Sequence, residues 1–129
     1  MPSVVFVCVA NSFRSQMAEA LAKSMAGKDW DIWSAGSSPG GRLHPLAIEL
    51  MREAGLSLEG HYSKGLAELP QRRWDYVVTM GCGDACPMLP AAHRLDWDLP
   101  DPATLGPEGA RKIRDQLTTL VRGLVDAAA

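Results

Sequence analysis

The segment from Cys8 to Ser15 contains residue types that can bind and attack a tetrahedral oxyanion. It lies between an apolar run and a helical pattern, so several backbone N–H groups can converge on one anion, and the dipole of the following helix adds to the attraction. Arg14 offers a planar fork of donors that matches two oxygens of such an anion. The same field favours the thiolate form of Cys8, which is the nucleophilic form. We predict that Ser15 donates to this sulfur. The loop predicted to bind the oxyanion consists of Val9, Ala10, Asn11, Ser12, Phe13 and Arg14.

Two other interpretations of this segment are weaker. A free cysteine at the end of a core strand is usually a small buried hydrophobe, and Cys8 alone fits that description. The C-x5-R-S spacing between a strand and a helix favours the oxyanion loop instead. A nucleotide-binding P-loop needs Gly and Lys at positions where this segment has neither.

Two further cysteines, Cys82 and Cys86, lie four residues apart in a Gly-rich segment. An odd total of three cysteines argues against a structural disulfide framework and favours a metal, catalytic or redox role. The pair is within disulfide reach if the chain flexes. Half of a zinc site and two unreactive thiols are the alternatives, but the histidines show no ligand spacing, so no metal site is predicted. Those histidines are His44, His61 and His93.

The pattern of apolar residues predicts strands and helices in alternation. Strands are expected near residues 4–8, 31–34, 76–79 and 95–97. Apolar stripes of helices span 17–25, 46–51 and 113–124, with a helical turn at 66–69. This alternation predicts an α/β fold, a three-layer αβα arrangement with a four-stranded parallel sheet and helices on both faces. Ligands bind at the carboxyl ends of such strands, which is where Cys8, Cys82 and Asp101 are expected.

Length and composition set limits on the class of protein. The 129 residues, 47% apolar and 22% charged, predict one globular domain over 1–129. A net charge of -2 without a basic run predicts neither nucleic acid nor an anionic membrane as a partner. The apolar start is too short to span a membrane and has no basic segment before it, so a cytoplasmic protein is expected. A monomer is the default expectation.

Several short segments resemble a known family. Residues 11–19, NSFRSQMAE, are similar to the reductase version of the oxyanion loop, and further matches are Ser34-Ala35-Gly36, Val77-Val78-Thr79-Met80 and Asp101-Pro102. Over nearly the whole chain the sequence resembles the low-molecular-weight protein tyrosine phosphatase fold family and, within it, the thioredoxin-coupled arsenate reductases. The resemblance implies that the protein reduces arsenate to arsenite.

The resemblance also implies a role for each thiol. Cys8 would form an arsenate thioester, and Cys82 would attack Cys8 to release arsenite. Cys86 would then attack Cys82, and thioredoxin would reduce the Cys82–Cys86 disulfide. The spacing of the two cysteines is shorter than in the best-known members, so mycothiol with mycoredoxin is an alternative reductant. In the family, the aspartate matched by Asp101 protonates the leaving oxygen; Asp96 and Asp98 are nearby competitors.

No cofactor is expected to be required. Some reductases of the family hold a potassium ion, and Asn11, Glu19 and Ser34 match part of that site. Tyr62 and Lys64 occupy positions where the family has a hydroxyl and a carboxylate. We therefore expect the potassium site to be unoccupied, with the Lys64 ammonium in place of the ion; a solvated surface lysine is the alternative.

Two other functions remain open from the sequence. A low-molecular-weight tyrosine phosphatase would hydrolyse phosphomonoesters with Cys8, Arg14 and Asp101 and would not need the other thiols. A non-catalytic module would bind phosphate or sulfate in the same loop and respond to oxidants through the thiol pair. The presence of Cys82 and Cys86 favours the reductase.

Overall fold

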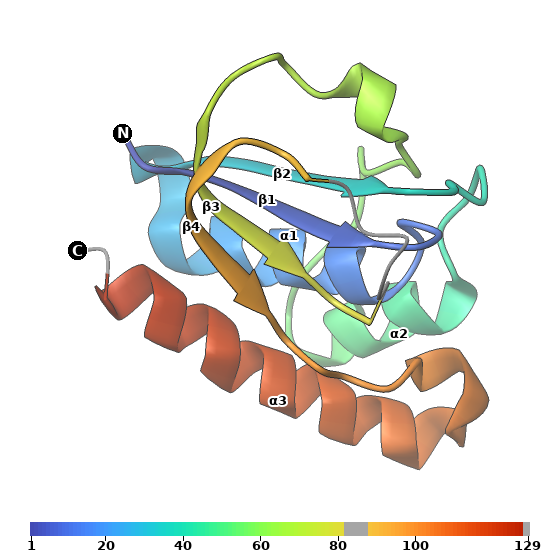
Figure 1. The fold of residues 1–129 in the computed structure, drawn as a ribbon. Helices are drawn as coiled ribbons and strands as arrows, with labels where there is room; N and C mark the ends of the chain where they lie inside the picture. The colour runs from blue at the N-terminus through green and yellow to red at the C-terminus, as the bar shows by residue number, and fades with distance from the viewer. Residues whose placement is uncertain (82–87, 128–129) are drawn as a thin grey trace.

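Four parallel strands form the centre of the fold in the order β2-β1-β3-β4 (Figure 1). The computed structural model describes residues 1–81 and 88–127. The strands are β1 Ser3–Cys8, β2 Asp31–Gly36, β3 Trp74–Thr79 and β4 Ala91–Asp96. Cys8 is in register with Gly36, and Val7 with both Ala35 and Thr79. The carboxyl ends of the strands therefore share one edge of the sheet, and Cys8 lies at that edge.

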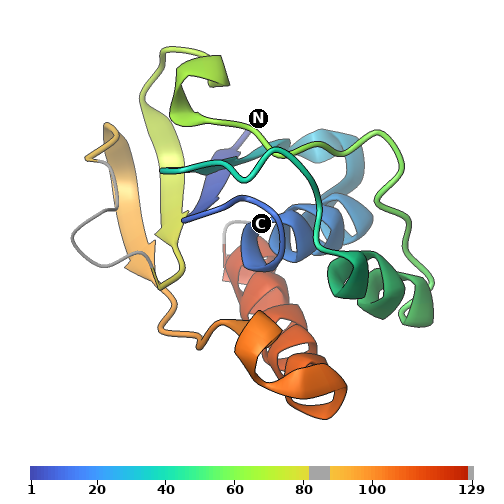
Figure 2. The same ribbon diagram turned by 90° about the vertical axis from the view of Figure 1, so that its right-hand side faces the viewer.

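The three α-helices found among the described residues lie on the same face of the sheet (Figures 1 and 2). They are α1 Arg14–Ala26, α2 Pro45–Glu53 and α3 Gly106–Ala127. Short 3-10 helices are η1 Gly27–Asp29, η2 Leu66–Glu68 and η4 Pro102–Thr104. Burial of apolar side chains drives this packing: Phe6 and Val78 of the sheet share one core with Met17, Leu50 and Leu117 of the helices.

A thinner layer covers the opposite face. Val5, Val7 and Val77 pack there in a second core with Leu69 and Trp74. This third layer contains η2 and its flanking loops, whereas the α-helices of the described residues lie on the other face. The segment between α2 and β3 contains Gly60, Gly65 and Pro70, which are poor residues for a long helix. The α/β class with a four-stranded parallel sheet is confirmed.

The fourth strand begins earlier than its sequence indicates. It spans Ala91–Asp96, whereas the apolar pattern placed it at 95–97. β4 is an edge strand with five exposed residues, so burial imposes no apolar run on it. The apolar signal comes instead from Trp97 and Leu99, which are buried just after the strand. None of the helices within 1–81 and 88–127 is long and apolar enough to cross a membrane.

Candidate functional site

The loop between β1 and α1 turns its carbonyl groups outward. The carbonyl oxygens of Cys8, Val9, Ala10 and Ser12 accept hydrogen bonds of 2.9–3.1 Å from backbone N–H groups outside the loop. These donors belong to Ser37, Ser38, Gly40 and His44. The N–H groups of residues 10–13 donate to no other described residue. They are therefore available to an anion, as in other anion sites at helix N-termini.

The side chain of Asn11 maintains this loop. Its Nδ2 donates to Ser15 Oγ at 2.8 Å and to Ser34 Oγ at 3.0 Å. Its Oδ1 accepts from Gln16 Nε2 at 2.9 Å and from the Lys64 backbone N–H at 2.8 Å. Asn11 has φ 50°, the only positive φ among the described residues other than glycine. Asparagine tolerates this left-handed conformation better than most residues do. The fully buried amide thus ties the loop to the start of α1 and to two segments that are distant in the sequence.

The thiol of Cys8 has one direct polar partner in the described structure. Its Sγ lies 2.8 Å from Ser15 Oγ, and Cys8 is only 3% exposed. Because Ser15 Oγ accepts the hydrogen bond from Asn11, its own proton is free to point at the sulfur. The sulfur therefore has a hydroxyl donor at the end of β1, beside the N-terminus of α1.

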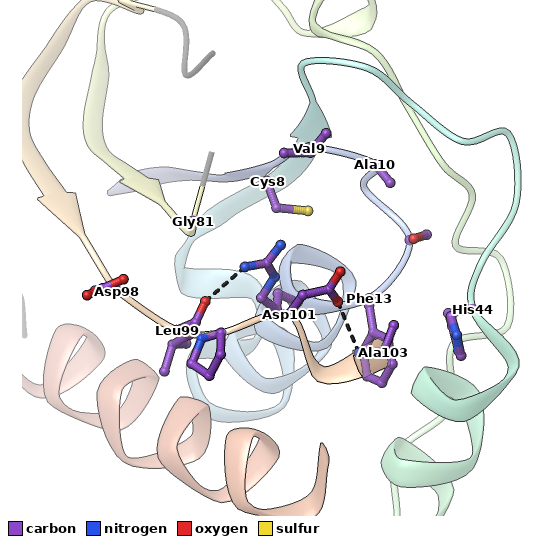
Figure 3. Close-up of a pocket in the computed structure, with 13 residues that line it drawn as sticks. Cys8, Val9, Ala10, Phe13, His44, Gly81, Asp98, Leu99, Asp101 and Ala103 are labelled. Carbon is purple, nitrogen blue, oxygen red and sulfur yellow. Dashed lines mark hydrogen bonds between the residues drawn. The ribbon is translucent and has the colours of Figure 1, made fainter. Parts of the chain in front are cut away.

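A cavity of about 590 Å³ opens over Cys8 (Figure 3). The predicted residues that line it are Cys8, Val9, Ala10, Ser12, Phe13, Arg14 and Asp101. Asn11 and Ser15 do not line it, because their buried side chains support the loop from behind. The guanidinium of Arg14, 8% exposed, donates through Nη1 to Leu99 O at 2.9 Å. That bond uses one of its five N–H donors and leaves the others for an anion.

Asp101 lies across the cavity from the thiol. In Figure 3 the carboxylate of Asp101 lies below the Cys8 sulfur, whereas that of Asp98 is set well to one side of it. Asp101 Oδ1 accepts from the Ala103 N–H at 3.0 Å, which caps η4 and fixes the carboxylate. The other competitor, Asp96, accepts instead from Thr79 Oγ1 at 3.0 Å. The geometry therefore favours Asp101 as the acid.

A buried charge cluster lies behind the loop. Lys64 Nζ is 3.4 Å from Glu19 Oε1 and 3.3 Å from Ser34 Oγ, and Lys64 is 5% exposed. Lys23 Nζ contacts the other Glu19 oxygen at 2.6 Å. Burial alone would raise the pKa of Glu19, but the hydrogen bonds from Lys23 and Ser34 and the charge of Lys64 hold it below its usual 4.5. Glu19 is therefore ionised at neutral pH and compensates the lysine charge.

The chain matches a family whose sites attack phosphate esters. Residues 3–129 match the family described as low molecular weight phosphotyrosine protein phosphatase. The chain belongs to this family.

Cys82 and Cys86, the predicted resolving pair, lie outside the described residues. Within 1–81 and 88–127 no cluster of His, Cys, Asp and Glu side chains is arranged to hold a metal ion.

Relatives within the phosphatase family include arsenate reductases. Arsenate reductase 2 of Staphylococcus epidermidis is 35% identical over 123 residues, which cover 92% of each chain. A solved structure described as "An arsenate reductase in the phosphate binding state" superposes with a TM-score of 0.89, at 33% identity and full coverage of both chains. The Corynebacterium glutamicum thioredoxin-dependent arsenate reductase Cg_ArsC1' is 38% identical, with a TM-score of 0.81, over 98% of this chain and 60% of that one.

Sequence reasoning missed several components of this phosphatase-family site. His44, Gly81 and Leu99 all line the cavity. His44 is the N-cap of α2, where its Nδ1 accepts from the Leu46 N–H at 3.1 Å, and its ring packs 4.8 Å from that of Phe13. The His-Pro pair before an apolar stripe marks this cap in the sequence. Leu99 contributes its backbone carbonyl. Because every residue type has this group, the sequence could not indicate its role.

His61 makes the stability of the protein depend on pH. Its Nδ1 is 2.9 Å from Gln16 Oε1 and 3.8 Å from Glu19 Oε2. Burial lowers the pKa of His61 below its usual 6.5, although the charge of Glu19 opposes this shift. The unfolded chain therefore binds the proton more readily than the folded protein, and the free energy of unfolding decreases as the pH falls below about 6.5.

We expect His61→Gln to reduce this pH dependence. Glutamine can donate to Gln16 but does not titrate. Urea unfolding at pH 7.5 and pH 5.5 should therefore show a smaller decrease in the free energy of unfolding for the variant than for wild type. His93→Gln on the exposed strand β4 is the matched control and should lose stability as wild type does. Equal losses in wild type and His61→Gln would contradict the prediction.

Proposed function

We propose that this chain is an arsenate reductase in which Cys8 is the nucleophile. The observation that carries the proposal is the contact between Cys8 Sγ and Ser15 Oγ at the base of a cavity that Arg14 and Asp101 also line. Arsenate reductases of about 35% identity over nine-tenths of the chain support the choice of substrate. Two more cysteines, Cys82 and Cys86, provide the thiols that reduction requires.

The first step forms a bond between sulfur and arsenic. Arsenate lies against the loop of residues 9–14, where backbone N–H groups and the Arg14 guanidinium offset its negative charge. The Cys8 thiolate attacks the arsenic, and one arsenate oxygen departs as water after Asp101 protonates it. Ser15 stabilises the thiolate beforehand through its hydroxyl, and arsenic remains pentavalent in the resulting thioester.

The second step transfers two electrons to arsenic. The Cys82 thiolate attacks the Cys8 sulfur, the sulfur–arsenic bond breaks, and its electron pair leaves with arsenic as arsenite. The two cysteine sulfurs are thereby oxidised to a disulfide. Cys86 then attacks Cys82, which releases Cys8 as a thiolate and moves the disulfide to Cys82–Cys86. A dithiol reductant finally reduces that bond.

Thioredoxin is the reductant that we propose. The structural relative from Corynebacterium glutamicum is described as thioredoxin-dependent, which supports this assignment. Mycothiol with mycoredoxin is the alternative that the short Cys82–Cys86 spacing leaves open. The cysteine thiols have to be kept reduced between turnovers, so we propose a cytoplasmic location. We also propose that the enzyme acts as a monomer with one domain.

The relay predicts a distinct outcome for each cysteine. With arsenate, thioredoxin, thioredoxin reductase and NADPH, wild type should consume NADPH continuously, while Cys8→Ser, Cys82→Ser and Cys86→Ser should each lose multiple turnover because one exchange partner is missing. Replacing thioredoxin by mycothiol and mycoredoxin identifies the reductant. Hydrolysis of p-nitrophenyl phosphate by all variants except Cys8→Ser, without arsenate turnover, would instead identify a phosphatase.

We also propose that the Lys64 ammonium provides the positive charge that a potassium ion supplies in some relatives. Two of the three side chains that match the potassium site, Glu19 and Ser34, already contact Lys64 Nζ. A potassium ion does not fit between them unless the ammonium moves away. Through Ser34, which also accepts from Asn11, the lysine supports the loop beneath Cys8.

The rate of arsenate reduction should therefore be equal in potassium and sodium buffers of the same ionic strength. Lys64→Met keeps most of the aliphatic stem but removes the charge, so it should lower kcat/KM for arsenate. Lys23→Met is the matched control: it removes a charge from the same carboxylate but has no contact with Ser34 among the described residues, and it should affect the rate less. Activation of wild type by potassium would contradict the proposal.

A further inference from the structure

Gly81 borders the guanidinium of Arg14 so closely that a side chain does not fit between them. A Cβ atom built on Gly81 would lie 2.3 Å from Arg14 Nη1 and 3.4 Å from Arg14 Cζ. It would also lie 3.2 Å from Leu99 O, the carbonyl to which Nη1 donates. Contacts below 3.0 Å are essentially absent between real Cβ atoms and their neighbours. The guanidinium therefore occupies space that only a glycine leaves free.

The neighbours of this guanidinium limit its freedom to move aside. Arg14 is 8% exposed, and its Nη1 is held at 2.9 Å by Leu99 O. Figure 3 shows Gly81 at the end of β3 and Leu99 after β4, with Cys8 above this bond. A methyl group at position 81 would break the Leu99 contact and turn the fork of donors away from the loop. Bidentate recognition depends on the direction of that fork as well as on its charge.

We propose that Gly81 is a positioning residue for oxyanion binding, because the absence of its side chain fixes the direction of the Arg14 guanidinium. This inference rests on the proposed function of the loop as an oxyanion site. Gly81 acts through Arg14 and need not touch the anion. A side chain at position 81 should weaken the binding of any tetrahedral oxyanion, including phosphate, while the thiol of Cys8 stays in place.

Gly81 also has φ +70°, which strains other residues irrespective of the space available. Two control variants separate this strain from the contact with Arg14. Gly55 has φ +80°, and a Cβ atom at that position would meet no other atom within 4 Å, so Gly55→Ala introduces strain alone. Gly81→Asn places a Cβ beside Arg14 in a residue type that tolerates positive φ, as Asn11 shows at φ 50°.

The test is calorimetric titration of inorganic phosphate into the fully reduced protein, which requires no relay through Cys82 or Cys86. Loss of a charge-assisted hydrogen bond predicts that Gly81→Ala and Gly81→Asn weaken phosphate binding by about 10- to 100-fold. Gly55→Ala should remain within about twofold of wild type. In arsenate turnover, the Gly81 variants should raise KM more than they lower kcat, because the bond between Cys8 and arsenic needs no atom of Gly81.

A double-mutant cycle with Arg14→Lys decides whether the effect passes through the guanidinium. Lysine lacks Nη1 and Cζ, so adding Gly81→Ala to Arg14→Lys should change phosphate affinity by less than about twofold. An equal loss in both backgrounds would overturn the inference, as would normal phosphate binding by folded Gly81→Ala and Gly81→Asn. If wild type itself does not bind phosphate, the oxyanion site fails, and with it the proposed function.

Discussion

The hydrogen bonds of the Asn11 amide are the constraint on which the site depends. A loop that turns its carbonyls outward and its N–H groups inward needs a residue in the left-handed conformation, and Asn11 provides it with φ 50°. Its side chain then satisfies four groups at once, including Ser15 Oγ and Ser34 Oγ. Removing the amide would leave buried polar groups without partners, which is costly in a protein interior.

The buried charges behind the loop have to balance for this arrangement to persist. Lys64 brings a positive charge into a region that is almost closed to water. The Glu19 carboxylate compensates this charge and also forms an ion pair with Lys23. An unpaired buried charge would be strongly destabilising, so the buried Lys64 and Glu19 depend on each other. Ser34 connects this cluster to Asn11, and through Asn11 and Ser15 the network reaches Cys8. The thiol of Cys8 thus rests on a continuous network of hydrogen bonds.

The sequence was most informative where the chemistry lies in one continuous segment. The spacing from Cys8 to Ser15 is local, and a strand followed by a helix fixes its geometry. Asp101 was recognised by resemblance, and its position opposite Cys8 depends on the path of the chain after β4 (Figure 3). Its protonation of the leaving oxygen remains a prediction.

Contacts between distant segments could not be predicted. The Leu99 carbonyl meets Arg14 across 85 positions, and any residue type has such a carbonyl. Gly81 resembles an ordinary turn glycine until its distance to the guanidinium is known. The exposed edge strand β4 needs no apolar pattern, so its first residues carried no signal. The placement of the described α-helices on one face likewise depends on long-range packing.

The central claim is that the thiols of this chain reduce arsenic rather than only hold an oxyanion. The most direct test mixes prereduced protein with arsenate in the absence of any reductant and quantifies arsenite and free thiols. We predict about one arsenite released and about two thiols lost per chain, since one disulfide supplies two electrons. Retention of all thiols without arsenite, in a protein that binds arsenate, would contradict the claim.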